Sequence, residues 1–546
     1  MNWLTNFSGS AGRAIVSQTS VKLFVDGRYT FQAKEEINKK EIELDHLKNY
    51  WKCIKQLEKK NGVLALDTKL HSIQEVLKIK NLFYKSKLKV DFLDYNPIDK
   101  IWEYKPKYPR SLIFNHDTKF AGVKRENKIK RFQKFLINKK IDYYFLSSLD
   151  SIAWILNLRG NDIQYTPIFL SNLLIPAKGK LTLFTFHNNI EKKAREQLKS
   201  TCKLESIHNF EKSIKIIVEG SIVSMDYSNT SFFNKNLCER YKLKTKNLLN
   251  PCILYKAIKN KIELNGAKKS NIRDGVSVTK FIFKLKKTNN LNTISEIEAA
   301  KILFSLRKNN KLFYSPSFET ISAVSKHAAF PHYRVTKYSN LNFQKNKIYL
   351  FDSGAQYKDG TTDITRTVIL GNPTEEHKEL FTRVLKGHIA IASHIFPKGT
   401  TGTDIDYLAR KSLNQVGYDF DHGTGHGIGS FLSVHEGPQK IAKKNNVKSV
   451  ELLPGMILSN EPGYYKENDF GIRIENLIIV KKHKKNLIKF ETISWAPIDR
   501  DLIYKKLLNN YEIKWINWYH SNVYKKLKIF LLIKEKKWLK EVTKAL

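Results

Sequence analysis

The sequence predicts an α+β protein built from two related α/β domains in tandem, a larger domain with a mostly antiparallel sheet, and a small helical domain at the end. Three observations support this fold class. The length of 546 residues exceeds what one hydrophobic core supports. A short segment near the start recurs as residues 154–160. Near residue 256 the hydrophobic pattern changes, and helical spacing gives way to a series of strands.

The first two predicted domains, residues 1–120 and 121–255, share this repeat. Trp3–Gly9 aligns without gaps on Trp154–Gly160, and a strand-like apolar run and a turn follow each copy. Because a repeated supersecondary unit indicates repeated structure, we expect two related α/β domains. A helical pattern over residues 126–141 opens the second domain, and strand and helix patterns alternate in the first.

The third predicted domain, residues 256–490, begins with helices. Apolar residues recur at helical spacing over residues 261–287. In the next helix Thr293 precedes Glu296 by three residues, which predicts a capping box at its start.

A further helix is predicted over residues 377–396, because Pro397 and Gly399 follow it as stop signals. The rest of this domain has the pattern of strands. These strands are predicted over residues 318–324, 347–354, 362–370, 456–465 and 471–480. The mixture predicts a largely antiparallel α+β domain.

The last predicted domain, residues 491–546, is helical and rich in aromatic residues. Trp515, Trp518 and Tyr519 lie close together in it. If exposed, they suit an interface with another chain; the alternative is packing within the domain. The sequence alone does not decide between the two.

The net charge of +43, from 95 basic and 52 acidic residues, raises the question of an anionic partner such as nucleic acid. However, the lysines are spread along the whole chain, and runs such as residues 481–485 are typical of turns. Together with the abundance of Asn and Ile, this indicates a compositional bias of the source. We expect no specific nucleic-acid partner.

The cysteines Cys53, Cys202, Cys238 and Cys252 are widely spaced and form no C-x-x-C pair. This pattern is typical of reduced thiols in a cytoplasmic protein. No stretch approaches the about 20 apolar residues of a membrane-spanning helix, and the start of the chain lacks the pattern of a secretion signal. We therefore expect a cytoplasmic protein without a membrane partner.

Two aspartates lie eleven positions apart in neighbouring predicted strands: Asp352 in YLFDSG and Asp363 in TTDITRT. A hairpin centred on Tyr357 and Lys358 would place them opposite each other, with their Cβ atoms about 5 Å apart. Two carboxylates that close repel each other unless a proton or a cation lies between them. The pair therefore indicates a cation site.

Three more potential ligands lie in the same domain. Glu461 ends an apolar run, and Glu475 lies within another, where burial of an unpaired carboxylate would be costly. His426 lies in HGTGHGIG, whose glycines allow close approach of a ligand. Four carboxylates and one imidazole favour Mn²⁺ or a similar ion over a structural zinc, and bridging carboxylates favour a pair of ions.

Each of these residues also has an ordinary interpretation. A single Asp or Glu is more often a turn cap or a salt-bridge partner. HGTGHGIG could be a phosphate-binding loop, although it lacks the Lys-Ser/Thr ending of such loops. His332 and His435, taken alone, would more often be surface or core histidines. The metal hypothesis therefore depends on all of these residues occurring in order within one domain.

The ordered series Asp352, Asp363, His426, Glu461 and Glu475 resembles the metal-ligand set of the methionine aminopeptidase, prolidase and aminopeptidase P superfamily. The segments FDSGAQYKDGTTDITRT, HGTGHGIG, VHEGP, SNEPGYY and GIRIEN are similar to the long, multi-domain form of aminopeptidase P. This resemblance implies a pita-bread catalytic domain, preceded by two creatinase-N-like domains and followed by the helical domain. It also implies removal of the first residue from peptides with proline in second position, and a homodimer.

The resemblance also implies a role for each site residue. Asp352 would bind one metal ion, Asp363 and Glu475 would bridge two, and His426 and Glu461 would complete the set of ligands around the other ion. The ions would be Mn²⁺ in preference to Zn²⁺, Co²⁺ or Fe²⁺. Catalysis would use Glu461 as proton shuttle and His332 and His435 as donors to the substrate and the oxyanion. His422 would line the pocket, and Arg473 would anchor the site electrostatically.

The sequence departs from this family pattern in two places. It begins directly at the Trp3 motif, so that either the first domain would be truncated at its start or its start would be misassigned. The loop before His332 reads SKHAA over residues 325–329, where relatives commonly have a Gly- and Asn-containing loop. The second departure would affect the fit of the substrate and not the metal ions.

Two alternative functions follow from the same residues. A prolidase uses this ligand set but cleaves only dipeptides. A relative without metal would instead bind peptides, histones or nucleic acid, and the complete set of ligands argues against this alternative.

Overall fold

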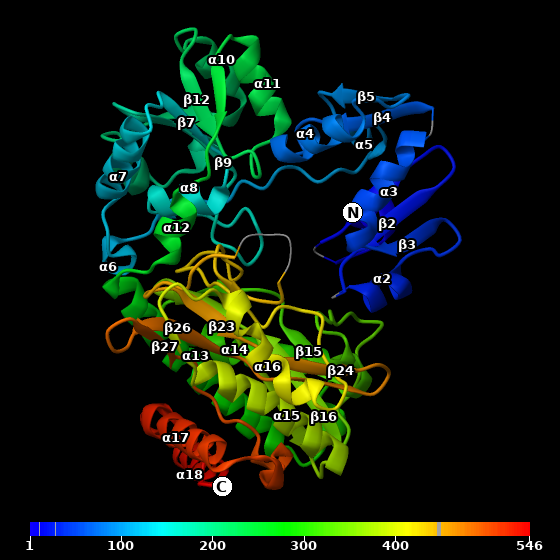
Figure 1. Cartoon of the computed structure of the whole chain (residues 1–546). Coiled ribbons are helices and arrows are strands. Elements are labelled where there is room, and N and C mark those ends of the chain that lie inside the picture. The colour runs from blue at the N-terminus through cyan, green and yellow to red at the C-terminus, as the bar shows by residue number, and fades with distance from the viewer. Residues whose placement is uncertain (10, 28, 60, 445–448) are drawn as a thin grey trace. The chain divides into compact units, whose positions relative to one another are not determined.

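The computed structural model describes residues 1–9, 11–27, 29–59, 61–444 and 449–546. Its contacts divide the chain into two compact units: Lys48–Lys256, and Met1–Leu47 together with Ala257–Leu546. Figure 1 colours the chain from blue at the N-terminus to red at the C-terminus. Within the described ranges, no helix is both long enough and apolar enough to span a bilayer.

The unit Lys48–Lys256 contains a six-stranded sheet in the order β11-β10-β9-β7-β12-β13. Strand β9 is antiparallel to both its neighbours, and the other neighbouring strands are parallel. The strands are β7 (Tyr143–Leu146), β9 (Ser171–Pro176), β10 (Leu181–Thr185), β11 (Cys202–Ser206), β12 (Ile222–Met225) and β13 (Lys244–Asn247). The helices between them are α7 (Arg125–Asn138), α8 (Leu149–Ile155), α9 (Lys192–Leu198), α10 (Phe210–Lys215), α11 (Phe232–Arg240) and α12 (Cys252–Ala257). Helix α7 confirms the helical pattern predicted over residues 126–141.

Shorter elements complete this unit. Strands β4 (Gly62–Asp67) and β5 (Leu88–Leu93) are parallel and are connected through α4 (Ile73–Leu82), whose first turn is capped by Ser72 Oγ. The remaining elements are α3 (Tyr50–Gln56), α5 (Ile98–Ile101), α6 (Thr118–Ala121), β6 (Phe114–Asn115) and β8 (Leu158–Arg159).

The predicted internal repeat has the same local structure in both copies. Trp3 lies in α1 (Asn2–Thr5) and Trp154 in α8. An asparagine with a positive φ angle follows each helix: Asn6 (58°) directly after α1, and Asn157 (49°) two residues after the end of α8, a conformation that Asn tolerates better than most residues. An antiparallel pair and then a parallel strand follow in both copies. In the first copy these strands are β1 (Arg13–Val16), β2 (Val21–Val25) and β3 (Ile42–His46), with α2 (Thr30–Glu36) between the last two.

The part of the second unit that follows Ala257 is mixed α and β, as predicted, and all its paired strands are antiparallel. Among the described residues they form five small sheets: β14-β17-β18, β15-β16-β19, β20-β27-β26-β23, β24-β25 and β21-β22. The strands are β14 (Phe313–Pro316), β15 (Ile321–Val324), β16 (Lys347–Ser353), β17 (Ala355–Tyr357), β18 (Gly360–Thr361), β19 (Ile364–Leu370), β20 (Ile395–Pro397), β21 (Gly425–His426), β22 (Lys440–Ile441), β23 (Ile457–Asn460), β24 (Gly463–Lys466), β25 (Phe470–Arg473), β26 (Asn476–Lys482) and β27 (Leu487–Thr492).

Long helices accompany these sheets (Figure 1). They are α13 (Lys261–Lys286), α14 (Glu296–Lys308), α15 (Glu375–Ala392), α16 (Gly402–Asn414), α17 (Asn510–Leu527) and α18 (Ile533–Val542). One large apolar core joins α15, α16 and α17 to strands β23, β25 and β26. The C-terminal helices therefore pack into the same core as the strands that carry the site.

The predicted register of the aspartate hairpin is wrong. Strands β16 and β19 pair with Asp352 opposite Thr365, and Asp363 lies two positions before Thr365. The two aspartates therefore share one face of the sheet but are diagonal neighbours, which places them farther apart than a directly opposed pair.

The turn lies one residue later than predicted, at Lys358 and Asp359, because β17 pairs with β18 around these residues. Contacts with α13 hold it there: Asp359 forms an ion pair with Arg273. A Cβ atom at Gly360 would come 2.5 Å from Ser270 Oγ. These contacts join distant segments, so local alternation could not locate the turn.

Other boundaries also differ from the prediction. The capping box at Thr293 is wrong, because Ser295 caps α14 by accepting a hydrogen bond from the Glu298 backbone N–H. Helix α15 ends at Ala392, before Pro397. The predicted strands over 456–465 and 471–480 are each divided in two.

The aromatic residues of the C-terminal region are mostly packed within it. Trp515 and Tyr519 are 9% and 0% exposed and stack with ring centroids 5.3 Å apart, whereas Trp518 is 48% exposed. Two of the three residues are therefore buried, in the core that α17 shares with α15, α16 and the strands of the site.

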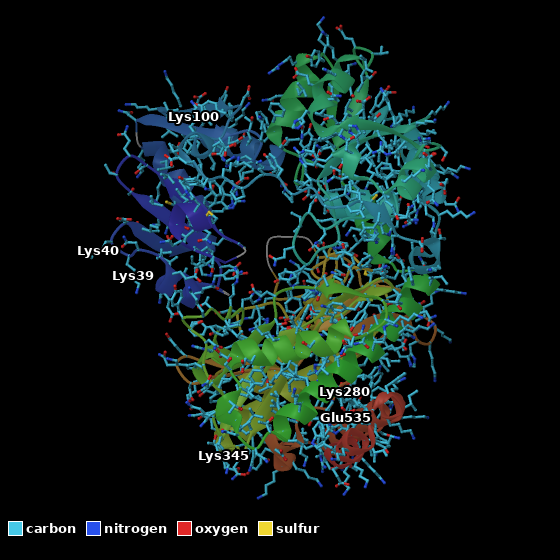
Figure 2. All side chains as sticks on the ribbon, turned by 180° about the vertical axis from the view of Figure 1, so that it is seen from behind. Lys39, Lys40, Lys100, Lys280, Lys345 and Glu535 are labelled. Atoms are coloured by element: carbon cyan, nitrogen blue, oxygen red, sulfur yellow. The ribbon has the colours of Figure 1, made fainter. Side chains whose placement is uncertain are left out.

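Positive charge is present on both units. Figure 2 labels Lys39, Lys280 and Lys345 in one unit and Lys100 in the other. Lys280 Nζ lies 3.9 Å from Glu535 Oε2, which brings α13 and α18 together. The distribution of these lysines agrees with the even spread seen in the sequence.

Replacing Arg307 with Met is expected to lower the free energy of unfolding by about 3–5 kcal/mol. Arg307 on α14 forms two hydrogen bonds of 2.8 Å with the carboxylate of Asp274 on α13, and both side chains are 3% exposed. The substitution leaves a buried carboxylate without its cation. Chemical denaturation measures the effect. Lys544→Met, which breaks an exposed pair with Glu541, is the control and is expected to leave the midpoint unchanged. An equal midpoint for the two variants would contradict the prediction.

Candidate metal centre

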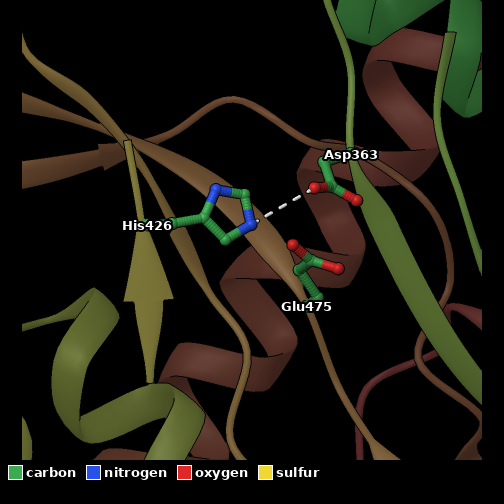
Figure 3. Close-up of side chains that lie close together, drawn as sticks. All are labelled: Asp363, His426 and Glu475. Carbon is green, nitrogen blue, oxygen red and sulfur yellow. Dashed lines mark ion pairs between the residues drawn. The ribbon is translucent and has the colours of Figure 1, made fainter. Parts of the chain in front are cut away.

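Asp363, His426 and Glu475 converge although they lie far apart in the chain. Asp363 directly precedes β19, His426 lies on β21, and Glu475 connects β25 to β26. One ligand atom from each lies within 4.8 Å of the others (Figure 3). Asp363 and Glu475 are 3% and 1% exposed. Carboxylates and an imidazole in this arrangement are a donor set for a divalent transition-metal ion.

Glu461 and Asp352 extend this cluster. Glu461 follows β23, and its Oε1 atom lies 3.3 Å from His426 Nε2, which is 3.5 Å from Asp363 Oδ2. Asp352 lies on β16, near enough to Asp363 for its charge to act on that carboxyl. The structure therefore brings the five predicted ligands around one site.

The electrostatics of the site favour a bound cation. Burial raises the pKa of Asp363 well above its ordinary value, and the nearby carboxylates of Asp352 and Glu461 raise it further. Burial likewise raises the pKa of Glu475, with contributions from Asp363 and Glu461. Burial also raises the pKa of Glu461, although His426 opposes this. A positive charge among these acids would remove the repulsion between them.

The oxygen atoms of the site fit divalent metal ions. Asp352 Oδ1, Asp363 Oδ1 and Glu475 Oε1 are buried and accept no hydrogen bond from any residue in the described ranges. A buried acceptor without a partner is costly, and a metal ion would satisfy it. Nitrogen and oxygen ligands lie about 2.0–2.2 Å from such ions, so that two ligands of one ion lie about 3 Å apart, near the separations seen around His426 Nε2.

Arg473, predicted as an electrostatic anchor, holds one ligand directly. Its Nη2 donates to Asp352 Oδ2 at 2.8 Å and its Nη1 donates to the Tyr465 hydroxyl at 2.7 Å. Burial lowers the pKa of Arg473, but Tyr465, Asp352 and Glu461 outweigh burial and raise it overall. Arg473 therefore remains a cation beside the acids.

Tyr465 was not predicted from the sequence. Its hydroxyl lies 2.8 Å from His422 Nε2 and links that histidine to Arg473. Burial raises the pKa of Tyr465 to about 12. Tyr465 and Arg473 lie on adjacent strands in an antiparallel register that places Gly463 opposite Arg473. Tyr465 is two positions after Gly463 and therefore shares the strand face of Gly463. This alternation is a local signal that could have identified Tyr465.

The remaining predicted histidines differ in position. The ring of His435 lies 4.2 Å from that of His426, so His435 borders the ligands. His332 contacts Tyr29 of the N-terminal segment, with His332 Nδ1 3.4 Å from the Tyr29 hydroxyl. The structure therefore places His435 beside the ligands and His332 against Tyr29, a residue that nothing in the sequence marked.

The glycines of HGTGHGIG permit the close packing that the sequence suggested. A Cβ atom at Gly425 would lie 2.1 Å from Ser459 O, and one at Gly427 would lie 2.0 Å from Glu436 O. Any side chain at these positions would push the loop away from β23. The alternating glycines therefore bring His426 within reach of Glu461.

Arg410 on α16 also holds the HGTGHGIG loop in place. It donates to the main-chain oxygen of His422 at 3.0 Å and to Asp406 Oδ2 at 2.7 Å. Asp406 in turn accepts from Thr424 Oγ1 at 2.6 Å. The loop is thus anchored on both sides of Gly423.

The unusual segment before His332 is a short 3₁₀ helix, Ser325–Ala329. His327 Nδ1 lies 2.9 Å from Glu296 Oε1, and its ring stacks on Tyr333 with centroids 4.4 Å apart. This buried pair holds the loop that carries His332 against α14.

Removal of metal is expected to destabilise the protein, and Mn²⁺ is expected to restore it. An ion bound only by the folded state, at about 100 times its Kd, raises the free energy of unfolding by about 2.7 kcal/mol. Thermal unfolding of EDTA-treated protein, with and without added Mn²⁺, measures the shift. The Asp363→Ala variant is the control and should show none. Identical Tm values for the treated and reloaded protein would rule out a metal centre here.

Comparisons with known families cover almost the whole chain. A profile described as metallopeptidase family M24 matches residues 266–482. Two profiles of the creatinase/prolidase N-terminal domain match residues 1–98 and 104–263. A profile of the C-terminal region of peptidase M24 matches residues 486–546.

Individual proteins are similar over almost the whole of this chain. The chain is 35% identical over 567 residues to a protein of Coccidioides posadasii (strain C735) named Probable Xaa-Pro aminopeptidase P, covering 100% of this chain and 87% of that one. A protein of the same name from Laccaria bicolor is 34% identical, with 96% and 84% covered.

Solved structures agree with these relatives. The crystal structure of an X-prolyl aminopeptidase from Caenorhabditis elegans, described as a cytosolic enzyme with a di-nuclear active site, has a TM-score of 0.94 and 30% identity, and covers 100% of this chain and 92% of its own. A prolidase from Thermococcus sibiricus has a TM-score of 0.57 and 25% identity, and covers 69% of this chain and 98% of its own.

Proposed function

Because the chain belongs to metallopeptidase family M24, we propose that it is an Xaa-Pro aminopeptidase, which removes the first residue from peptides with proline in second position. The observation that carries this proposal is the cluster of Asp363, His426 and Glu475 with Asp352 and Glu461 around it. The full-length similarity to relatives named Xaa-Pro aminopeptidase P supports the choice of substrate. The matched family profiles agree with a pita-bread catalytic domain preceded by two creatinase-N-like domains.

We propose that Asp352, Asp363, His426, Glu461 and Glu475 hold two divalent ions. When metal is bound, Asp352 would hold one ion, His426 and Glu461 would hold the other, and Asp363 and Glu475 would be shared by the two. The oxygen-rich set favours Mn²⁺. When bound, such ions polarise the scissile carbonyl and lower the pKa of the attacking water. Support for the pair of ions comes from the buried acceptors that no described residue satisfies.

In this proposal, the remaining residues move protons and orient the substrate. Glu461 carries a proton from the attacking water to the leaving amine. His435 and His332 donate hydrogen bonds to the substrate and to the developing oxyanion. His422, held by Tyr465, lines the pocket, and Arg473 keeps Asp352 ionised and in place.

Proline in the second position of the substrate has a physical consequence. The scissile bond is a tertiary amide that has no N–H to donate. The site must therefore recognise this bond through its carbonyl and through packing on the ring. The histidine donors suit the carbonyl, because a neutral imidazole offers an N–H for it.

Three further features are proposed. The C. elegans relative described as cytosolic supports a cytoplasmic location. Four parts, residues 1–120, 121–255, 256–490 and 491–546, are proposed as domains.

A homodimer through the last part is supported by exposed apolar residues between α17 and α18: Ile529, Phe530, Leu532 and Ile533, which are 52–73% exposed. Sedimentation of the wild-type chain beside an Ile529→Glu variant tests the dimer.

A peptide assay tests the function. Purified protein with Mn²⁺ is given an Xaa-Pro-Yaa tripeptide, the matching Xaa-Ala-Yaa tripeptide and the dipeptide Gly-Pro. We expect cleavage of the first peptide, at a rate at least about 100-fold above the second, in the range set by loss of specific contacts. Cleavage of Gly-Pro alone would identify a prolidase instead. No cleavage of any peptide, with metal bound, would favour a binding protein.

A further inference from the structure

A buried polar network lies directly behind the metal ligands and ends on helix α17. Its members are at most 1% exposed: Arg366, His388, Asn460, Asn476 and Tyr519. Asn460 directly precedes Glu461, and Asn476 directly follows Glu475. The network is therefore linked to two of the proposed ligands through the main chain.

Arg366 forms the centre of this network. Its Nη1 donates to the main-chain oxygens of Thr365 at 2.9 Å and Glu475 at 2.7 Å. The Thr365 oxygen also accepts from the Glu475 N–H at 3.2 Å, and Thr365 Oγ1 donates to Glu475 Oε2 at 2.7 Å. One guanidinium thus holds both main-chain segments that determine where the Glu475 carboxylate points.

The other side of Arg366 faces the C-terminal region. Its Nη2 donates to the Tyr519 hydroxyl at 2.7 Å, to Asn476 Oδ1 at 2.9 Å and to Ala496 O at 2.9 Å, and its Nε donates to Pro497 O at 3.2 Å. All these acceptors are neutral oxygens arranged around the planar guanidinium group of Arg366. A lysine offers a single donor position and could not satisfy them.

His388 on α15 connects the two asparagines. Its Nδ1 lies 3.1 Å from Asn460 O, and its Nε2 lies 3.1 Å from Asn476 Nδ2. Because the asparagine nitrogen can only donate, Nε2 accepts and Nδ1 carries the proton. Burial lowers the pKa of His388 to about 3, so the ring is neutral in this role.

We propose that Tyr519 and Arg366 are positioning residues for Glu475, so that helix α17 supports the metal centre from outside the catalytic sheets. This inference rests on the proposed function only in taking Glu475 as a metal ligand. Groups that hold a metal ligand typically contribute 10–100-fold in metal affinity or activity. Tyr519 acts through Arg366, which contacts both the Tyr519 hydroxyl and the main-chain oxygen of Glu475.

Tyr519→Phe tests the proposal, because it removes one hydroxyl and keeps the ring that stacks on Trp515. Full-length protein is treated with EDTA and titrated with Mn²⁺ by calorimetry, and kcat and KM are measured with an Xaa-Pro-Yaa peptide. We expect Mn²⁺ to bind about 10-fold more weakly and kcat to fall by a similar factor while KM is unchanged. Arg366→Lys should have a larger effect.

Tyr144→Phe is the matched control. Tyr144 is also fully buried, and its hydroxyl also donates to a main-chain oxygen, that of Leu248 at 2.9 Å, but it lies in the other unit. We expect this variant to bind Mn²⁺ as the wild type does.

Two outcomes would overturn the proposal. One is an Mn²⁺ affinity and a kcat of Tyr519→Phe both within twofold of wild type. The other is a loss of thermal stability at unchanged Mn²⁺ affinity, which would show a merely structural role. If instead the wild-type protein cleaves no Xaa-Pro peptide while Tyr519→Phe still weakens Mn²⁺ binding, the positioning role stands and the proposed function fails.

Discussion

Asp363→Ala is expected to abolish metal-dependent peptidase activity, with a loss of kcat/KM of more than about 10³-fold, because it removes a ligand proposed to bridge both ions. The carboxylate is buried and lies 3.5 Å from His426 Nε2. Its removal takes away a carboxylate that lies beside both His426 and Glu475. Elemental analysis of the purified variant is expected to show loss of bound metal in parallel.

Asp499→Ala is the matched control for this variant. Asp499 is also a buried acid of the same unit, and it pairs with Lys286 at 2.8 Å and accepts from the Ile369 N–H at 2.9 Å. We expect its replacement to lower stability while metal content stays at the wild-type level. Mn²⁺-dependent cleavage of an Xaa-Pro peptide by Asp363→Ala would refute the assignment of the site.

Glu461→Gln is expected to lower kcat by about 10²–10⁴-fold, the range of a lost proton-transfer group. The amide has nearly the same shape as the acid but cannot carry the proton. It can still accept from Ser459 Oγ, which lies 3.0 Å from Glu461 Oε1. Rapid-mixing kinetics together with metal analysis would separate lost chemistry from lost metal.

Ser459→Ala gives a graded comparison, because it removes that hydrogen bond and leaves the carboxylate. We expect kcat to fall by about 10-fold, which is typical for the loss of a residue that orients a metal ligand. If Glu461→Gln with a full complement of metal turns over within tenfold of wild type, Glu461 is not the proton shuttle.

The local parts of the fold followed from the sequence. Helical spacing identified α13 and α15, and alternation identified β16 and β19, because the period of apolar residues reports which face of an element is buried. The repeat around Trp3 and Trp154 correctly indicated matching local structure, including the asparagine with a positive φ angle that follows each helix.

Details that depend on partners far away in the chain did not follow. The hairpin turn is at Lys358 and Asp359 because Asp359 pairs with Arg273 on α13, and no local pattern contains that information. Glu296 was predicted to cap its own helix. It is instead buried and accepts from the Val324 N–H and from the Tyr333 hydroxyl.

The sequence by itself determined the chemistry of the site: hard carboxylate oxygens with one imidazole, and glycines where backbones must approach closely. Only the tertiary structure decided how these groups face one another, which places Arg473 on Asp352 and Arg366 between Glu475 and Tyr519. The physical reason is the range of the forces involved. Residue type and local periodicity express propensity and burial, whereas hydrogen bonds between segments more than 100 residues apart exist only after the chain has packed.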